Sequence, residues 1–363
     1  MDSDRVPLLM NYNPTIALNT PNLNLSQSQQ TAFMLICVAK YHCTLRDELL
    51  EPEVIRLGKR EIPLDMGQYR NLLYSTRIPK KGKDQIYQPE VKRGHATILH
   101  RGRFYKIQVM DGDYEIRPVE ELLAEIEAVI QDGHAQGQNK HPVSALSLTE
   151  RDLWAENREE LIQISAENEQ NLADIDESMV LAVLDDFKYK TPDEALRHGV
   201  GGPGNNRWPD KSFQLIIGQD SSIQLNFEHA WGDGAAILNI ERTIYDYVTQ
   251  NNEQILTEAT KSRRSERFSK VQTLDFEINS KLRHQIELAI GTYHQRFDDF
   301  KVKTFEVGRA PALLNHHWYQ GSDKSNEMST MVNRKWMKKY KIGADAFMQL
   351  SLQFAAAEYY GNG

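Results

Sequence analysis

A histidine and an aspartate four residues apart, His229 and Asp233, lie in the segment FEHAWGDGAAIL (227–238). The residues before them alternate as in a strand, those after them have helical spacing, and Gly232 and Gly234 allow a sharp turn. An imidazole at the end of a strand can act as a general base, and a nearby carboxylate can fix its tautomer. The alternative is a structural pair that ties the turn, which the residues alone favour because such pairs are common.

Three other segments carry residue types suited to binding. The stretch NRKWMKKYKIGADAF (333–347) places five basic residues before an expected helix, which suits a phosphorylated ligand, although most charge runs are solvated faces. The glycine-rich segment 201–213 lacks the Gly-Lys-Ser/Thr ending of a nucleotide loop, and its Arg207 and Trp208 fit packing as well as binding. The adjacent histidines at 316–317 have no second ligand pair, so we expect no metal site.

Composition excludes several classes of protein. The 363 residues are 40% hydrophobic and 26% charged with a formal net charge of -8, so we expect a globular protein without general affinity for nucleic acid or anionic membrane. Cys37 and Cys43 lack metal-ligand spacing and fit the core of a protein from a reducing compartment. The longest apolar run, residues 32–39, is far shorter than the roughly 20 residues of a membrane span. The acidic start predicts neither a secretory signal nor a transit peptide.

The elements that must position these residues follow from periodicity. Strand pairs are expected within 97–110, around Arg101–Arg103, and within 211–229, and 177–187 is either a buried strand or the end of a helix. We expect Gly133 to close one helix and Thr149 to cap another. The helices are expected at 23–49, 119–133, 148–164, 235–250, 277–297 and 343–361, with a short helix and a loop in 63–86. The fold class is therefore α/β or α+β, with a mixed sheet flanked by helices and no repeat.

The segment NRWPDKSFQLIIGQDSSIQLNFEHAWGDGAAIL closely resembles the catalytic segment of the choline/carnitine acyltransferases. The stretches VPLLMNYNP, TLRDELLEPEV, PLDMGQYRNLLYSTRIP, LTERDLWAENREEL, VLAVLDDF and KKYKIGADAFMQLSLQFAAAEYYG follow in the order of that family. The resemblance spans nearly the whole chain. It implies a CoA-dependent acyltransferase fold like that of chloramphenicol acetyltransferase, with this chain forming mainly the N-terminal of two similar domains.

The resemblance also implies roles for individual residues. His229 matches the family's catalytic histidine, which deprotonates the hydroxyl of carnitine or the thiol of CoA, and Asp233 matches the acidic residue that orients it. Arg334, Lys338 and Asp345 match the site for the CoA phosphates, with Arg334 in place of the more usual lysine. No cofactor is implied, because acyl-CoA and carnitine are the substrates. The Trp231–Gly232 pair resembles the long-chain carnitine enzymes of the family.

The chain departs from the family pattern in ways that affect the expected activity. It stops at AEYYGNG, where the family continues into a TYESCST stretch and a second domain, so residues 1–363 are expected to form a partial acyltransferase domain with impaired catalysis. Two alternatives stay open: a non-catalytic protein that binds CoA esters, and an acyltransferase of other chain-length or acceptor specificity. The resemblance further implies the matrix side of the mitochondrial inner membrane, with peripheral membrane contact in the full-length protein through an insert that this chain lacks.

Overall fold

The computed structural model describes residues 2–18, 23–112, 114–251 and 272–304, together with positions 257, 341, 349 and 353. The chain divides into two compact units, Met1–Val302 and Lys303–Gly363, and all the elements named below lie in the first. The helix expected at 343–361 falls outside the described residues, apart from positions 349 and 353.

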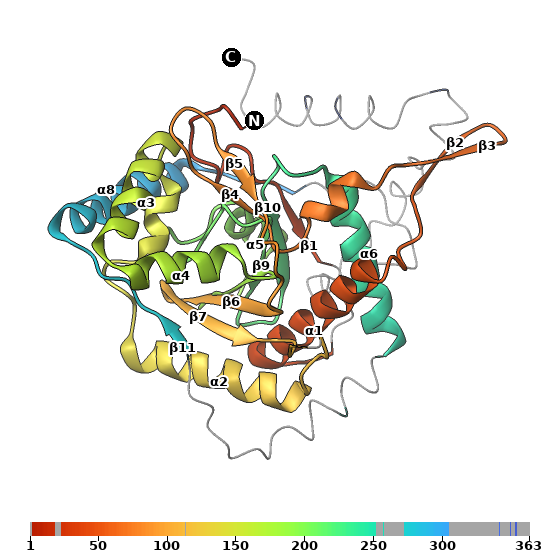
Figure 1. Ribbon diagram of the computed structural model, residues 1–363, viewed down its shortest axis with the longest axis horizontal. Coiled ribbons are helices and arrows are strands. Elements are labelled where there is room, and N and C mark those ends of the chain that lie inside the picture. The colour runs from red at the N-terminus through yellow and green to blue at the C-terminus, as the bar shows by residue number, and fades with distance from the viewer. Residues whose placement is uncertain are drawn as a thin grey trace, which may run out of the picture. The chain divides into compact units, whose positions relative to one another are not determined.

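A seven-stranded mixed sheet forms the centre of the first unit, with strand order β1-β10-β9-β8-β6-β7-β11 (Figure 1). The strands are β1 (Thr15–Ala17), β6 (His95–His100), β7 (Arg103–Gln108), β8 (Leu181–Leu184), β9 (Phe213–Ile217), β10 (Ile223–Phe227) and β11 (Gln272–Leu274). Strands β6, β8 and β9 are parallel, so their carboxyl ends share one edge of the sheet. Strand β10 runs antiparallel to β9, and its carboxyl end therefore lies at the opposite edge.

Helices cover both faces of this sheet, which confirms the expected α/β class. The sheet has a hydrophobic core on each face, because successive side chains of a strand point to opposite sides. In β8, Ala182 and Leu184 face the first core, and Leu181 and Val183 face the second. The first core is completed by α1 (Gln27–Arg46), α2 (Val119–Gln136) and α6 (Gly234–Gln250). The second is completed by η2 (Val143–Leu148), α3 (Arg151–Ile164), α4 (Ala166–Asp176) and α8 (Ser280–Asp299).

The remaining elements are small and lie around this framework. They are β2 (Val54–Leu57) paired with β3 (Arg60–Pro63), β4 (Thr76–Ile78) paired with β5 (Gln85–Tyr87), η1 (Gly67–Asn71) and α5 (Pro192–Val200). The hairpins predicted at 97–110 and 211–229 are confirmed, and 177–187 contains the strand β8. None of the described helices is both long and apolar enough to cross a lipid bilayer.

The first long helix follows its sequence signals closely. It begins after Ser26, whose hydroxyl accepts from the Gln29 amide while the Gln29 side chain accepts from the Ser26 amide, a complete capping box. Within the helix Cys37 is buried and Cys43 is partly buried, which confirms that both cysteines belong to the core. Burial raises the pKa of the Cys37 thiol to about 12, so this thiol stays protonated at neutral pH.

Two boundary predictions are wrong. Gly133 does not close α2, which continues to Gln136. It lies against His100, where a Cβ would come within 2.3 Å of the ring carbon Cδ2, so the glycine is required for a close approach and not for a cap. Thr149 does not cap α3, because its hydroxyl donates to the Leu146 carbonyl and Glu150 occupies the N-cap position. Helices α4 and α5 and the β2–β3 hairpin were not expected, because their apolar positions are too few to reveal a period.

Candidate active site

His229 lies immediately beyond the carboxyl end of β10, in the short turn before α6. Its imidazole stacks against the Phe227 ring, with centroids 6.0 Å apart and planes inclined by 24°. The side chain keeps 29% of its surface exposed, whereas every residue of β10 is buried. The structure therefore holds a solvent-accessible imidazole on a rigid strand end, which is a suitable position for a general base.

Asp233 occupies the N-cap of α6, and its carboxylate is committed to that helix. Its Oδ1 accepts a hydrogen bond from the Gly234 amide at 2.7 Å, and its own amide donates to Gln68 Oε1 at 2.8 Å. The same Oδ1 lies 3.9 Å from His229 Nε2, and the Asp233 side chain is 83% exposed. The two side chains are therefore neighbours at ion-pair distance, beyond the reach of a hydrogen bond.

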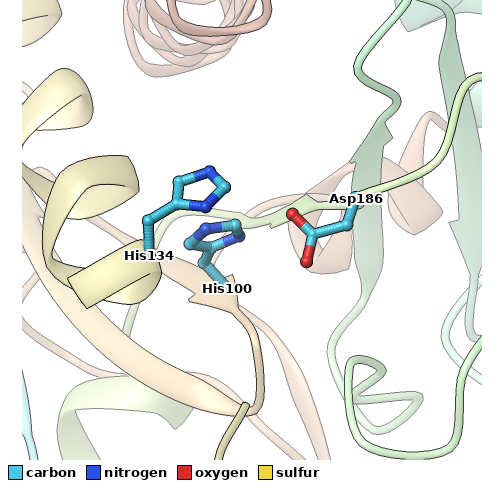
Figure 2. A group of neighbouring side chains, drawn as sticks. All are labelled: His100, His134 and Asp186. Atoms are coloured by element: carbon cyan, nitrogen blue, oxygen red, sulfur yellow. The ribbon is translucent and has the colours of Figure 1, made fainter. Parts of the chain in front are cut away.

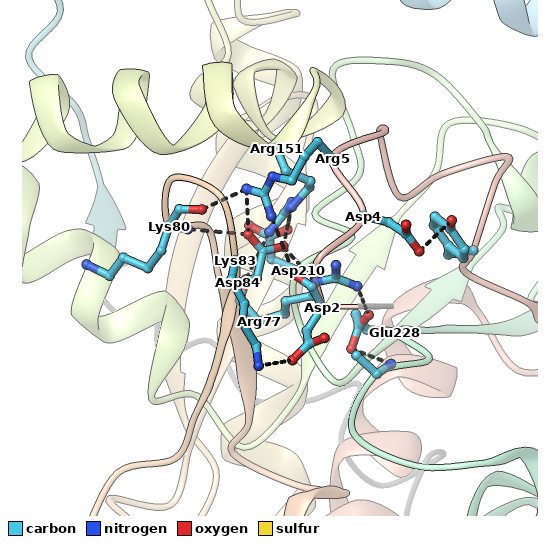
Figure 3. A network of polar contacts seen from close by, with 12 residues as sticks. Asp2, Asp4, Arg5, Arg77, Lys80, Lys83, Asp84, Arg151, Asp210 and Glu228 are labelled. Carbon is cyan, nitrogen blue, oxygen red and sulfur yellow. Dashed lines mark hydrogen bonds and ion pairs between the residues drawn. The ribbon is translucent and has the colours of Figure 1, made fainter.

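Glu228, the residue before the histidine, holds the turn in place through a buried ion pair and a backbone hydrogen bond (Figure 3). Its Oε1 accepts from Arg77 Nη1 at 2.8 Å, and its Oε2 accepts from the Ala230 amide at 2.9 Å. Burial raises the pKa of Glu228, and the Arg77 guanidinium opposes that effect by favouring the ionised carboxylate. Arg77 also donates from Nε to Asp84 Oδ2 at 2.7 Å, so the turn is connected to a larger network.

The network continues through Asp84, which accepts from Arg151 Nε at 2.8 Å and from Arg5 Nη2 at 3.0 Å. Arg151 Nη1 in turn donates to Asp210, whose second oxygen accepts from Trp154 Nε1 at 2.6 Å. The network thus pairs three guanidinium groups with three carboxylates. All of these side chains except that of Arg5 are almost completely buried. The local sequence does not reveal this network, because Arg77 and Arg151 stand next to polar residues in YSTRIP and TERDLW.

The glycine-rich segment 201–213 packs instead of presenting a ligand site. Arg207 is buried and makes two contacts of 2.8 Å to the carboxylate of Asp185. Trp208 is buried between Phe104 and Trp154, with T-shaped ring contacts at 5.2 and 5.4 Å. The packing interpretation of both residues is therefore confirmed.

The predicted CoA-phosphate residues Arg334, Lys338 and Asp345 lie outside the described residues, as do the histidines at 316–317. Their positions relative to His229 stay a prediction. Of the predicted site residues, the structure brings His229 and Asp233 together.

A cavity of about 820 Å³ lies beside the segment that positions Asp233. Tyr69 in its wall directly follows Gln68, the residue that accepts from the Asp233 amide. The lining combines apolar side chains with the cations Arg46, Arg70 and Lys92 and with the acids Glu48 and Asp65, so the cavity offers both apolar surface and charges of both signs. Sequence reasoning did not identify this cavity, because its walls come from several segments between His42 and Tyr114.

Comparisons with known proteins identify the family of the chain. The family model described as Choline/Carnitine o-acyltransferase matches residues 3–311. Carnitine O-palmitoyltransferase 2, mitochondrial, from Homo sapiens is 31% identical over 388 residues, covering 99% of this chain and 55% of that protein. Carnitine O-acetyltransferase from Columba livia is 27% identical over 373 residues, covering 99% of this chain and 54% of that protein. The chain spans about half the length of the curated relatives it matches.

Proposed function

The chain belongs to the choline/carnitine O-acyltransferase family, and from this premise we propose that it moves acyl groups reversibly between coenzyme A and carnitine. The observation that carries the proposal is the partly exposed imidazole of His229 at the end of β10, beside the N-terminus of α6. The proposed reaction requires no cofactor, because acyl-CoA and carnitine are themselves the substrates. The names of two relatives, carnitine O-palmitoyltransferase 2 and carnitine O-acetyltransferase, support carnitine as the acyl acceptor.

In the proposed reaction His229 acts as general base. It takes the proton of the carnitine hydroxyl, whose oxygen attacks the thioester carbonyl, so that a C–O bond forms and the C–S bond breaks. The departing CoA thiolate then receives the proton from the imidazolium, and no acyl-enzyme is formed. Asp233, at 3.9 Å, would favour the imidazolium by its charge while it holds the first turn of α6.

The finer parts of the proposal rest on similarity. We place the CoA phosphates at Arg334, Lys338 and Asp345, since the basic stretch 333–341 resembles the family's anion site. The names of the mitochondrial palmitoyltransferases among the relatives support long-chain substrates and a mitochondrial location. A part in fatty-acid oxidation at the matrix side of the inner membrane rests on the family resemblance alone. Trp231 is buried and donates from Nε1 to the Ser212 carbonyl at 2.9 Å, so its part in chain-length selection would be indirect.

A non-catalytic protein that binds CoA esters is the second candidate. Asp233 lies 3.9 Å from His229, beyond the reach of a hydrogen bond, and a CoA site can exist without a complete set of catalytic groups. Calorimetry with CoA and with carnitine separates the two candidates, because an acyltransferase must bind both substrates and the second candidate needs CoA alone.

The test is the carnitine-dependent release of CoA from palmitoyl-CoA and from acetyl-CoA. Replacing a general base should lower the rate about 10²–10⁴-fold, so His229→Gln should lose turnover while it still binds CoA. The control His284→Gln changes an exposed histidine of α8 and should leave the rate unchanged. Equal rates for the two variants would exclude His229 as the base, and absence of binding to both substrates would exclude both candidates.

A further inference from the structure

Two histidines and an aspartate converge at the edge of the sheet opposite to His229 (Figure 2). His100 is the last residue of β6, Asp186 follows β8 by two residues, and His134 lies in the last turn of α2. Strands β6 and β8 are parallel with His100 paired to Leu184, so their carboxyl ends bring the first two side chains together. One nitrogen or oxygen atom from each of the three residues lies within 4.8 Å of the others.

His100 has the environment of a preorganised metal ligand. Its Nδ1 lies 3.1 Å from the Leu184 carbonyl oxygen, and a carbonyl can only accept, so Nδ1 carries the proton. The other nitrogen, Nε2, therefore presents a lone pair. The residue is 99% buried, and Nε2 has no hydrogen-bond partner among the described residues. A metal-bound histidine characteristically donates its second N–H to a backbone carbonyl in this way.

The packing of α2 positions His134, and two neighbouring side chains position Asp186. Helix α2 approaches the His100 ring closely at Gly133, where a Cβ would lie 2.9 Å from Nε2. This brings the last turn of the helix, and with it the exposed His134, to the sheet edge. Gln138 Nε2 and Arg101 Nε lie 3.2 and 2.9 Å from Asp186 Oδ2. Among the described contacts Oδ1 is thus left available, while Oδ2 is held in place.

We propose that His100, His134 and Asp186 form a binding site for Zn²⁺, with water as the fourth ligand. Two imidazoles and one carboxylate are a donor set that suits zinc. In a tetrahedral zinc site the ligand atoms are about 3.3 Å apart. The three donor atoms lie within 4.8 Å of one another, so they must move closer together when the ion binds. The exposed side chain of His134 can make most of this movement by rotation, whereas His100 is fixed.

The ion would connect elements that are distant in sequence. It would fasten the carboxyl end of α2 to the carboxyl ends of β6 and β8, where His100 and His134 otherwise meet only by an edge contact of their rings at 5.8 Å. Strands β9 and β10 run in opposite directions, which puts His229 at the other edge of the sheet. The zinc site is therefore separate from the proposed acyl transfer, and binding at it does not depend on that function.

Titration of the untagged, metal-free chain with Zn²⁺, and with Co²⁺ as a spectroscopic probe, tests the proposal. We expect one ion per chain and the visible bands of tetrahedral Co²⁺ without thiolate charge transfer. His134→Ala and Asp186→Asn should each weaken Zn²⁺ binding about tenfold or more. His134 is exposed, so its variant should keep the unfolding temperature of the metal-free protein and lose the increase that Zn²⁺ gives to the parent chain.

Two controls distinguish this site from other zinc ligands of the chain. His284→Ala removes an exposed histidine on α8, and replacement of the histidines at 316–317 by alanine removes the adjacent pair. Both should bind Zn²⁺ as the parent does. Absence of saturable Zn²⁺ binding in the micromolar range, or binding that His134→Ala leaves unchanged, would overturn the proposal.

Discussion

Replacement of Arg77 by methionine should be among the most destabilising single changes at the base of the His229 turn. The Arg77 side chain is 1% exposed and bridges two carboxylates, with Nη1 at 2.8 Å from Glu228 and Nε at 2.7 Å from Asp84. Methionine fills a similar volume but offers no charge. Asp84 would keep Arg5 and Arg151, whereas Glu228 would keep only the Ala230 amide among its hydrogen bonds.

The magnitude follows from what remains buried. Removing one partner of a buried ion pair typically costs about 3–5 kcal/mol, because the other charge stays desolvated and uncompensated. Since Glu228 is 1% exposed and loses the guanidinium of its ion pair, we expect Arg77→Met to fall in that range. Adding Glu228→Gln removes the orphaned charge, so the double variant should recover part of the loss.

The pH dependence gives an independent check. Burial already raises the pKa of Glu228 in the parent chain, and loss of the guanidinium must raise it further. A carboxyl whose pKa is raised on folding contributes stability below its unfolded value, about 4.3 for Glu, and loses that contribution as pH rises through the folded pKa. The deficit of Arg77→Met should therefore be largest near pH 7 and shrink as the pH is lowered toward about 5.

Urea unfolding of the parent chain, Arg77→Met and the double variant, each at two pH values, measures these quantities. Arg242→Met is the matched control, because the ion pair of Arg242 with Asp246 is exposed and 3.8 Å long, and exposed pairs contribute little. A deficit for Arg77→Met no larger than that of Arg242→Met, or one that grows on acidification, would refute the reasoning.

Two further predictions concern α2, α6 and α8. Gly133→Ala should destabilise the chain by about 1–3 kcal/mol, because its Cβ would lie 2.3 Å from the His100 ring. Gly291→Ala, also inside a helix but with nothing within 4 Å of its Cβ, should stabilise by about 0.5–1 kcal/mol; thermal unfolding of both measures the contrast. Asp233→Ala should lose about 0.5–1 kcal/mol through the α6 cap and Asp233→Ser much less. Equal losses for the two Asp233 variants in urea unfolding would argue against capping.

Much of the framework could be predicted from periodicity, because the elements concerned are long or strongly alternating. Helix α1 has both a capping box and a continuous apolar stretch, and β9 and β10 form two alternating runs around a tight turn. Helix α4 escaped prediction because it buries more polar residues than apolar ones, among them Asn168 and Asn171. Helix α5 escaped prediction because the residues it buries are the small Ala195 and Gly199. Their place is decided by tertiary contacts, which periodicity does not report.

The functional residues also differ in how far they could be predicted from the sequence. His229 and Asp233 are four residues apart, so a local pattern was sufficient to find them. His100, His134 and Asp186 are separated by 34 and 52 positions in the chain, and they meet only through the parallel pairing of β6 with β8 and the close approach of α2 at Gly133. The buried arginine network was equally invisible, because a sequence gives the charges of Arg77 and Arg151 but not the burial that makes them costly to remove.

The strand order has a consequence for synthesis of the chain. Strand β1 pairs with β10 through Thr15 and Asn226, which are 226 − 15 = 211 residues apart. At roughly 5–20 residues per second, the partner of β1 leaves the ribosome about 10–40 s later. During that interval Ile16 lacks Leu225, its partner on β10. The speed of translation between residues 17 and 226 therefore sets how long β1 stays unpaired.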